Sequence, residues 1–233
     1  TGLTIKNLKS FSCKGWSDGI DLMCCNDVLI DNVFMRNSDD CIAIYAHRWN
    51  YYGGSRNVTL QNSILWADIA HPINIGGHGN PNDAIGEIVE NITVRNVDIL
   101  EQDEDDLPYQ GCMAVDCGDK NLVRKILFED IRVENIQEGR LFHINVRFNP
   151  TYDKQPGRGI EDVTFRNITY NGLGENPSLI KGFDKERGVK NVTFDNVIIN
   201  GVKMKDTDGF ITNEHIKNIN CLLYTSPSPR DRQ

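Results

Sequence analysis

The sequence contains no long apolar run. No stretch of its 233 residues approaches the roughly 18 consecutive apolar residues that a membrane-spanning helix requires. The first residues, TGLTIKNLK, also lack the basic and then apolar layout of a signal peptide. We therefore expect no membrane partner, and the sequence by itself does not specify a cellular location.

Clustered positive charge is also missing. The chain has 25 Lys and Arg against 33 Asp and Glu, which gives a formal net charge of -8. Nucleic acids bind proteins largely through clustered Lys and Arg side chains that release counterions from the phosphates. This composition predicts no nucleic-acid partner.

Two further patterns are absent. None of the seven cysteines forms a paired CxxC, so we expect free thiols, no zinc site and no metal or other cofactor. No segment shows helical periodicity over three turns. The sequence therefore favours a fold made of strands.

What the sequence does contain is a repeated phrase of alternating apolar and polar residues, rich in Val, Ile, Thr and Phe. This period of two is typical of strands. The phrase occurs at residues 3–11, 28–35, 58–65, 92–100, 126–133, 163–170 and 192–199. Its alignment places one polar residue in a single column at intervals of 25 to 37 residues: Asn7, Asn32, Asn62, Asn96, Asp130, Asn167 and Asn196. A repeat of this length indicates a stacked architecture.

A second, shorter apolar alternation lies between consecutive phrases, at residues 19–22, 41–46, 72–75, 112–115 and 141–146. Two strands per turn and a polar residue at a fixed corner predict an all-β fold, a right-handed single-stranded parallel β-helix of seven or more coils. We expect one catalytic domain over residues 1–220, belonging to a longer protein truncated at one or both ends. Residues 221–233 resemble a translated sequencing adapter and are expected to be a non-native tail.

The second set of strands also aligns a column of polar residues. Asp18 precedes Ile20 and Asp40 precedes Ile42 by the same interval, and His71 stands at the equivalent position on the following coil. Neighbouring strands lie about 4.8 Å apart, so we expect Asp18, Asp40 and His71 to converge, with Asp39 joining them. Continued by the same rule, the column reaches Gly111 and Arg140.

Three carboxylates at such range cannot all ionise cheaply, because like charges raise at least one pKa. A protonated acid beside an ionised carboxylate is what hydrolysis of a glycosidic bond requires. The alternatives are a calcium site or a solvated Asp-rich turn. Convergence of Asp18, Asp39 and Asp40 with His71 favours catalysis.

These residues resemble a known family. "SDGID", then "SDDCIAI", then "AHPINIG" followed by Gly-His-Gly at 77–79 are similar to glycoside hydrolase family 28, the polygalacturonases, whose pattern runs NTDG, (Q/G)DD and GHG. The resemblance implies Asp39 as the general acid, with Asp18 and Asp40 holding and deprotonating the attacking water. It also implies that His71 tunes the acid or positions the sugar, and that the reaction inverts the anomeric centre.

The sugar is less clear, because the Arg-Ile-Lys with which that family grips the substrate carboxylate is missing. It should fall on "QGCMAVD", where we expect Met113 and Val115 in place of the two cations. Arg140, His143 and Arg147 on the next coil are candidate replacements, although "LFHINVR" is equally a strand with solvated ends.

Other substrate-binding candidates are Trp49, Tyr51 and Tyr52, which offer aromatic faces for sugar rings, and His78 of the Gly-His-Gly. The acidic run "EQDEDD" (101–106) is expected to be a solvated surface. "ILWADIAHPINIG" is also similar to the dextranase and isopullulanase family 49, which shares the fold and acts on neutral α-glucans.

The sequence thus predicts a monomeric, metal-independent glycoside hydrolase acting on a polysaccharide or oligosaccharide, with a pectin-type substrate first and a neutral α-glucan second. The family resemblance implies a secreted or periplasmic protein. A non-catalytic carbohydrate-binding β-helix is the alternative from another class. A pectate lyase is disfavoured, since it would need a calcium cage and a basic residue where this chain has acid.

Overall fold

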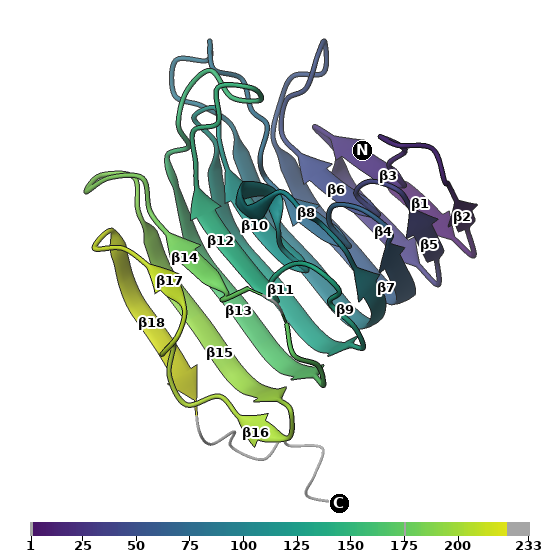
Figure 1. Ribbon diagram of the computed structural model, residues 1–233. Helices are drawn as coiled ribbons and strands as arrows, with labels where there is room; N and C mark the ends of the chain where they lie inside the picture. Colours follow the sequence, from purple (N-terminus) through teal and green to yellow (C-terminus); the bar gives the residue numbers. More distant parts are fainter. Residues whose placement is uncertain (1, 175, 223–233) are drawn as a thin grey trace, which may run out of the picture.

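The computed structural model describes residues 2–174 and 176–222, and their strands wind into stacked coils that lie side by side (Figure 1). The strands form an 11-stranded sheet and a 7-stranded sheet, and the pairings within both are parallel, apart from β15 with β16. The only helix in the described chain is a short 3-10 helix, η1 (Leu107–Tyr109). No helix there is long and apolar enough to cross a lipid bilayer. The predicted all-β, right-handed parallel β-helix is confirmed.

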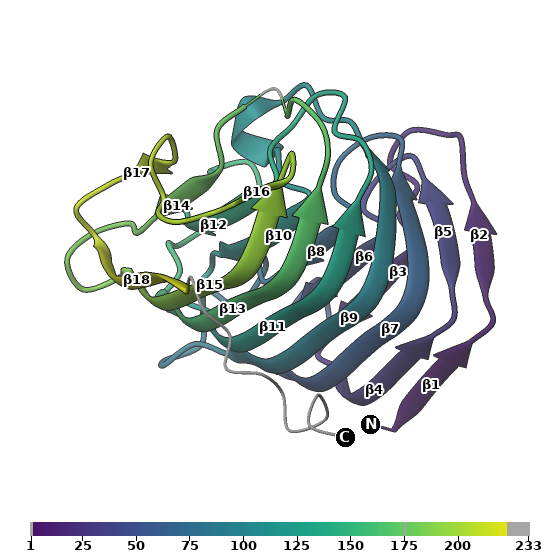
Figure 2. The same ribbon diagram turned by 90° about the horizontal axis from the view of Figure 1, so that it is seen from below.

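The large sheet holds the repeated phrases. Its strands are β1 (Leu3–Lys6), β4 (Asn26–Asp31), β7 (Ser55–Ala67), β9 (Ile88–Gln102), β11 (Leu122–Val133), β13 (Gly159–Tyr170), β15 (Val189–Ile199) and β16 (Val202–Lys203), with β2 (Lys9–Phe11), β5 (Phe34–Asn37) and β18 (Ile216–Leu222) beside them. The long strands curve together around the interior in Figure 2.

The small sheet holds the second set of alternations. In order of their position in the chain, its strands are β3 (Ile20–Met23), β6 (Ile42–Tyr45), β8 (Ile73–Ile75), β10 (Met113–Cys117), β12 (Phe142–Val146), β14 (Leu179–Lys181) and β17 (Ile211–Thr212). The last two strands are very short, and the sequence pattern did not reveal them.

The core fills the space between the two sheets. Each coil contributes inward residues, and these line up in columns that run from coil to coil. Phe128, Phe165 and Phe194 occupy paired positions on three consecutive strands, and their rings stack at centroid distances of 5.0 and 5.2 Å. Phe142 of the small sheet closes against Phe165 at 4.6 Å. Such interdigitation across coils explains why no single coil could form this core alone.

The predicted polar column lies at a corner of the coils. Every member of the column has a positive φ, between 51° and 58°, which Asn and Asp tolerate better than other residues with a side chain. Most neighbours in the column are joined by side-chain hydrogen bonds that form short ladders: Asn96 Nδ2 donates to Asn62 Oδ1 at 2.8 Å, for example. A second ladder, which the sequence analysis missed, includes Asn91 donating to Asn57 at 2.7 Å. Each ladder satisfies side-chain amides at a bend of the backbone.

The expected domain boundary after residue 220 stays a prediction. Cys221 and Leu222 are the last residues of β18, where they pair with Phe194 and Asp195. The rest of the expected tail, 223–233, lies outside the described residues. The cysteines are free thiols, as expected, and Cys41, Cys112 and Cys117 are buried, whereas Cys13 is exposed.

Candidate active site

The predicted column of polar residues is confirmed by the strand register. Ile20 pairs with Ile42, and Ile42 pairs with Ile73. The backbone continues this pairing into the turns: Gly19 N–H donates to Asp40 O at 2.8 Å, and Cys41 N–H donates to His71 O at 2.9 Å. Asp18, Asp40 and His71 therefore begin three adjacent strands of the small sheet.

The extension of the column is confirmed too. Met113 pairs with Ile73 and with Phe142, so Gly111 and Arg140 take the predicted places on the next two coils.

A cavity of about 530 Å³ opens on the outer face of the small sheet, beside this column. Asp18 and Asp39 lie in its wall at one side, and Arg147 lies at the other. The wall also includes Trp16, Tyr45, Arg48, Asn74, His78, Glu104, Asp106, Tyr109 and Tyr152. The cavity is large enough for sugar residues and carries charges of both signs.

Asp39 combines a place in the cavity wall with a raised pKa. Burial, followed by the negative charge of Asp40, raises the pKa of Asp39 from 3.8 to about 6. One oxygen of Asp39 accepts the Asp40 backbone N–H at 2.9 Å, which fixes the carboxyl group. Burial and Asp40 also raise the pKa of Asp18. One oxygen from each of Asp18, Asp39 and Asp40 lies within 4.8 Å of the others.

Asp40 differs from its two neighbours because it is buried and does not line the cavity. Its Oδ1 accepts from the backbone N–H of His71 at 3.1 Å and faces His71 Nδ1 at 2.7 Å. Its Oδ2 accepts from Asn74 Nδ2 at 2.8 Å and from the Tyr45 hydroxyl at 3.1 Å. Burial alone would raise the pKa of Asp40, but His71 and these hydrogen bonds together lower it. Both oxygens of Asp40 therefore interact with protein groups, and its predicted role toward the attacking water stays a prediction.

His71 is fully buried beneath the cavity rather than exposed in it. Burial alone would lower the pKa of His71, but the charge of Asp40 raises it. The Tyr109 ring packs edge-on against the imidazole at 4.3 Å. His71 therefore contacts Asp40 and does not line the cavity, and its predicted role of tuning the acid or positioning the sugar stays a prediction.

Two arginines bring positive charge to the cavity wall. Arg147 is 8% exposed and lies 3.6 Å from Asp116 and 3.5 Å from Asp153. Arg48, which the sequence analysis missed, lies over the rings of Tyr45 and Trp49 at 5.4 and 4.8 Å.

Comparison with known proteins places the chain in a family. The sequence model of Glycosyl hydrolases family 28 matches residues 1–221. The chain belongs to glycosyl hydrolases family 28. The probable endopolygalacturonase B of Aspergillus niger is 25% identical to this family 28 chain over 173 residues, which are 72% of this chain and 42% of the relative. The probable endopolygalacturonase D of Neosartorya fischeri is 23% identical over 66% of this chain and 29% of the relative.

A solved structure supports the fold. The family 28 exopolygalacturonase of Yersinia enterocolitica matches with a TM-score of 0.57 and 13% identity, over 91% of this chain and 39% of the other. The family 28 chain described here therefore spans less than half the length of each of these relatives.

The expected place of the missing cations needs correction. Met113 and Val115 point into the core of the family 28 chain and are fully buried. The period of two then makes Ala114 and Asp116 the outward residues of β10. The strand still offers no cation there, but the residues that occupy the outward positions are these two.

Of the three candidate replacements, the structure brings only Arg147 to the cavity. Arg140 is 3% exposed and donates to the carbonyl oxygens of Pro177 and Leu107. His143 is buried, with Nε2 at 3.4 Å from Asp116 Oδ1. Substrate contact by Arg140 and His143 is therefore not consistent with their burial.

Of the three aromatic candidates, Trp49 lies near the cavity and Tyr51 and Tyr52 do not line it. Trp49 lines a neighbouring hollow of about 400 Å³, which shares Arg48, His78 and Tyr152 with the cavity. Tyr51 and Tyr52 line neither of these two hollows. Tyr52 instead stacks on His47 at 4.3 Å.

His78 does line the cavity, and its ring meets Tyr45 edge-on at 4.8 Å. Burial and the nearby arginines lower the pKa of His78 to about 3, so the imidazole is neutral.

Two further acidic features are Asp21, to which the sequence pattern assigned no role, and the run 101–106, for which it predicts a solvated surface. Asp21 follows Asp18 by three residues, on the outward face of β3, and burial with the charges of Asp18 and Asp40 raises its pKa to about 7. The "GIDL" alternation could have revealed it, since Asp21 is the polar residue between two buried ones. The acidic run 101–106 is solvated only in part: Asp105 and Asp106 are exposed, whereas Glu104 is 6% exposed and lines the cavity with Asp106.

Proposed function

We propose that this family 28 chain carries the catalytic site of a polygalacturonase and hydrolyses glycosidic bonds of a pectin-type polysaccharide. The observation that carries the proposal is the pairing of Asp39 and Asp18 in the cavity wall above a buried, ionised Asp40. A carbohydrate-binding protein without activity would need no such convergence of carboxylates. Pectin is a plant cell-wall polymer, so this activity places the protein outside the cell or in the periplasm, where it acts as a monomer.

In the proposed reaction, Asp39 protonates the oxygen of the leaving sugar while water attacks the anomeric carbon. Asp18 faces the same cavity and, once ionised, orients this water and accepts its proton. The Asp40 carboxylate stays below the surface and keeps a proton on Asp39 through its charge. His71, Asn74 and Tyr45 stabilise that charge.

We propose inversion of the anomeric centre, which the family resemblance implies. The carboxyl groups of inverting enzymes are usually about 6.5 to 9.5 Å apart and those of retaining enzymes about 5 to 5.5 Å apart. Here one oxygen from each of Asp18 and Asp39 lies within 4.8 Å of the other. This separation is closer to the retaining range, so the proposed inversion rests on the family resemblance. Proton NMR of the first product formed distinguishes the two outcomes directly.

For the sugar, we propose galacturonate. The cavity wall holds Arg48 and Arg147, and a guanidinium group binds a carboxylate by paired, charge-assisted hydrogen bonds. A neutral α-glucan offers no partner for these cations. Arg147 thus replaces, from the following coil, the cations that β10 lacks.

The test is the release of reducing sugar from polygalacturonate, rhamnogalacturonan, dextran and pullulan by the protein and by its Asp39→Asn variant. We expect turnover of polygalacturonate and a loss of at least about 10²-fold in the variant, in line with removal of a general acid. Asp98→Asn serves as the matched control, because Asp98 pairs with Arg132 on the outer face of the large sheet. Unchanged turnover in Asp39→Asn would overturn the mechanism. Activity on dextran or pullulan alone would assign a neutral glucan instead.

A further inference from the structure

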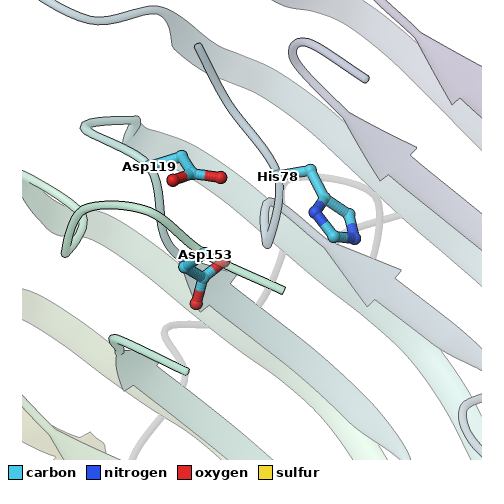
Figure 3. A group of neighbouring side chains, drawn as sticks. All are labelled: His78, Asp119 and Asp153. Carbon is cyan, nitrogen blue, oxygen red and sulfur yellow. The ribbon is translucent and has the colours of Figure 1, made fainter. Parts of the chain in front are cut away.

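Three side chains outside the catalytic column approach one another from loops of three consecutive coils (Figure 3). His78 follows β8, Asp119 follows β10, and Asp153 follows β12. Each of the three offers one ligand atom, and these atoms lie within 4.8 Å of one another. One imidazole nitrogen and two carboxylate oxygens are therefore neighbours.

The two carboxylates are held in place by backbone amides, each through one oxygen. Asp119 Oδ1 accepts from Lys154 N at 2.6 Å and from Gln155 N at 3.1 Å. Asp153 Oδ2 accepts from Asn149 N at 2.9 Å. The other oxygen of Asp153, Oδ1, is buried and has no hydrogen-bond partner among the described residues, and Asp153 as a whole is 1% exposed. A buried carboxylate oxygen without a partner lowers the stability of the fold. A ligand bound to this atom would remove that cost.

The backbone of Gly118 passes close to that oxygen. A Cβ placed on Gly118 would lie 2.5 Å from Asp153 Oδ1 and 2.5 Å from the carbonyl oxygen of Gly77. Only glycine fits at position 118, and its lack of a side chain lets Asp153 Oδ1 and the Gly77 carbonyl oxygen lie close to the same point of the backbone.

The balance of charge also favours a cation. Asp116, Asp119 and Asp153 are 1%, 4% and 1% exposed. Arg147 pairs with Asp116 and Asp153, whereas no cationic side chain in the described part of the chain forms an ion pair with Asp119. Buried carboxylates that outnumber their partners are destabilising unless another positive charge compensates them.

We propose that His78, Asp119 and Asp153 bind a divalent transition-metal ion of the Zn²⁺ class. One imidazole and two carboxylates suit Zn²⁺, whereas Ca²⁺ prefers a shell made of oxygen alone. The ion fastens together three loops that border the cavity, and it has a structural role rather than a catalytic one. The cysteine pattern predicts no metal, and these three residues lie 41 and 34 positions apart, without the short ligand spacing that a sequence motif would show.

The experiment is a titration of the chelator-treated protein with Zn²⁺ by calorimetry, with Co²⁺ as an optical substitute. We expect one ion per chain, a higher melting temperature with the ion, and Co²⁺ absorption bands typical of nitrogen and oxygen ligands. Asp119→Asn and Asp153→Asn should each weaken binding at least tenfold, whereas Asp98→Asn should bind as the unmodified protein does.

Failure of the unmodified protein to bind Zn²⁺ or Co²⁺ would overturn the proposal. The proposal would also be overturned if Asp119→Asn and Asp153→Asn both bound Zn²⁺ as tightly as the unmodified protein. Tighter binding of Ca²⁺ than of Zn²⁺ would overturn it too. If a variant fails to fold, the unmodified protein is treated with diethyl pyrocarbonate, which modifies histidine, with and without Zn²⁺. Peptide mass spectrometry should then show that Zn²⁺ protects His78 from modification, and a lack of protection would overturn the proposal. These measurements need no turnover, so their outcome is independent of the proposed reaction.

Discussion

Replacement of Asp40 by Asn tests how the buried charge controls the catalytic acid. The pKa of Asp39 is raised from 3.8 to about 6, first by burial and then by Asp40. Two charges within 4.8 Å repel by about 3.5 kcal/mol at an effective dielectric constant of about 20. The nearby His71 cancels a large part of this repulsion, and we expect the remainder to change the Asp39 pKa by about one unit.

The sign of the effect follows from the role of Asp39. This group must be protonated to act as an acid, so activity is present below about pH 6 and is lost as the pH rises through the Asp39 pKa. Asp18 must be ionised, so activity is also lost as the pH falls through its raised pKa. In Asp40→Asn the Asp39 pKa falls, and the alkaline limit of activity should move about one unit toward acid.

The assay is the pH profile of kcat/KM on polygalacturonate for the unmodified protein, Asp40→Asn and the Asp98→Asn control. Circular dichroism confirms that each protein is folded. Because both oxygens of Asp40 face the protein, residual activity in Asp40→Asn should remain measurable at acid pH. An alkaline limit that does not move in the folded variant would refute the electrostatic role. A loss as complete as that of Asp39→Asn at every pH would show that Asp40 takes part directly in the chemistry.

Three other substitutions address packing, the corner ladder and substrate charge. Phe165→Ala removes the central ring of the stack and should lower the free energy of unfolding by about 3 to 5 kcal/mol in denaturant titration, whereas a loss below about 1 kcal/mol would contradict the packing described. Asn96→Ala removes one donor from an exposed ladder and places Ala at a φ of 51°, so it should cost about 1 to 3 kcal/mol in the same measurement, and a cost below about 0.5 kcal/mol would contradict this assignment. Arg48→Gln should raise KM for oligogalacturonates by about tenfold with little change in kcat, and an unchanged KM would remove Arg48 from carboxylate recognition.

Much of the fold could be predicted from the sequence because a β-helix repeats one local pattern. The period of two fixes which residues face the core, and the recurring Asn marks the corner where φ is positive. The register that aligns Asp18, Asp40 and His71 follows from the same pattern, since parallel strands keep equivalent residues adjacent. That regularity also fixed the places of Gly111 and Arg140.

The error at Met113 and Val115 arose from the choice of face rather than from the register. The two cations of the family motif were assigned to the positions of Met113 and Val115, as if these faced outward. The alternation directs both side chains inward, and both are fully buried. Strict use of the period of two would have selected Ala114 and Asp116.

The sequence by itself determined the coil, the inward column and the convergence of the carboxylates, because these depend on spacing along the chain. Only the tertiary structure decided which groups reach the cavity. Asp40 is enclosed by Asn74 and Tyr45, while Arg48 and Arg147 enter the wall from loops after two separate strands. Loops have no repeat to fix their paths, so burial, pKa and the sign of charge at the site are set by contacts between coils that no local pattern contains.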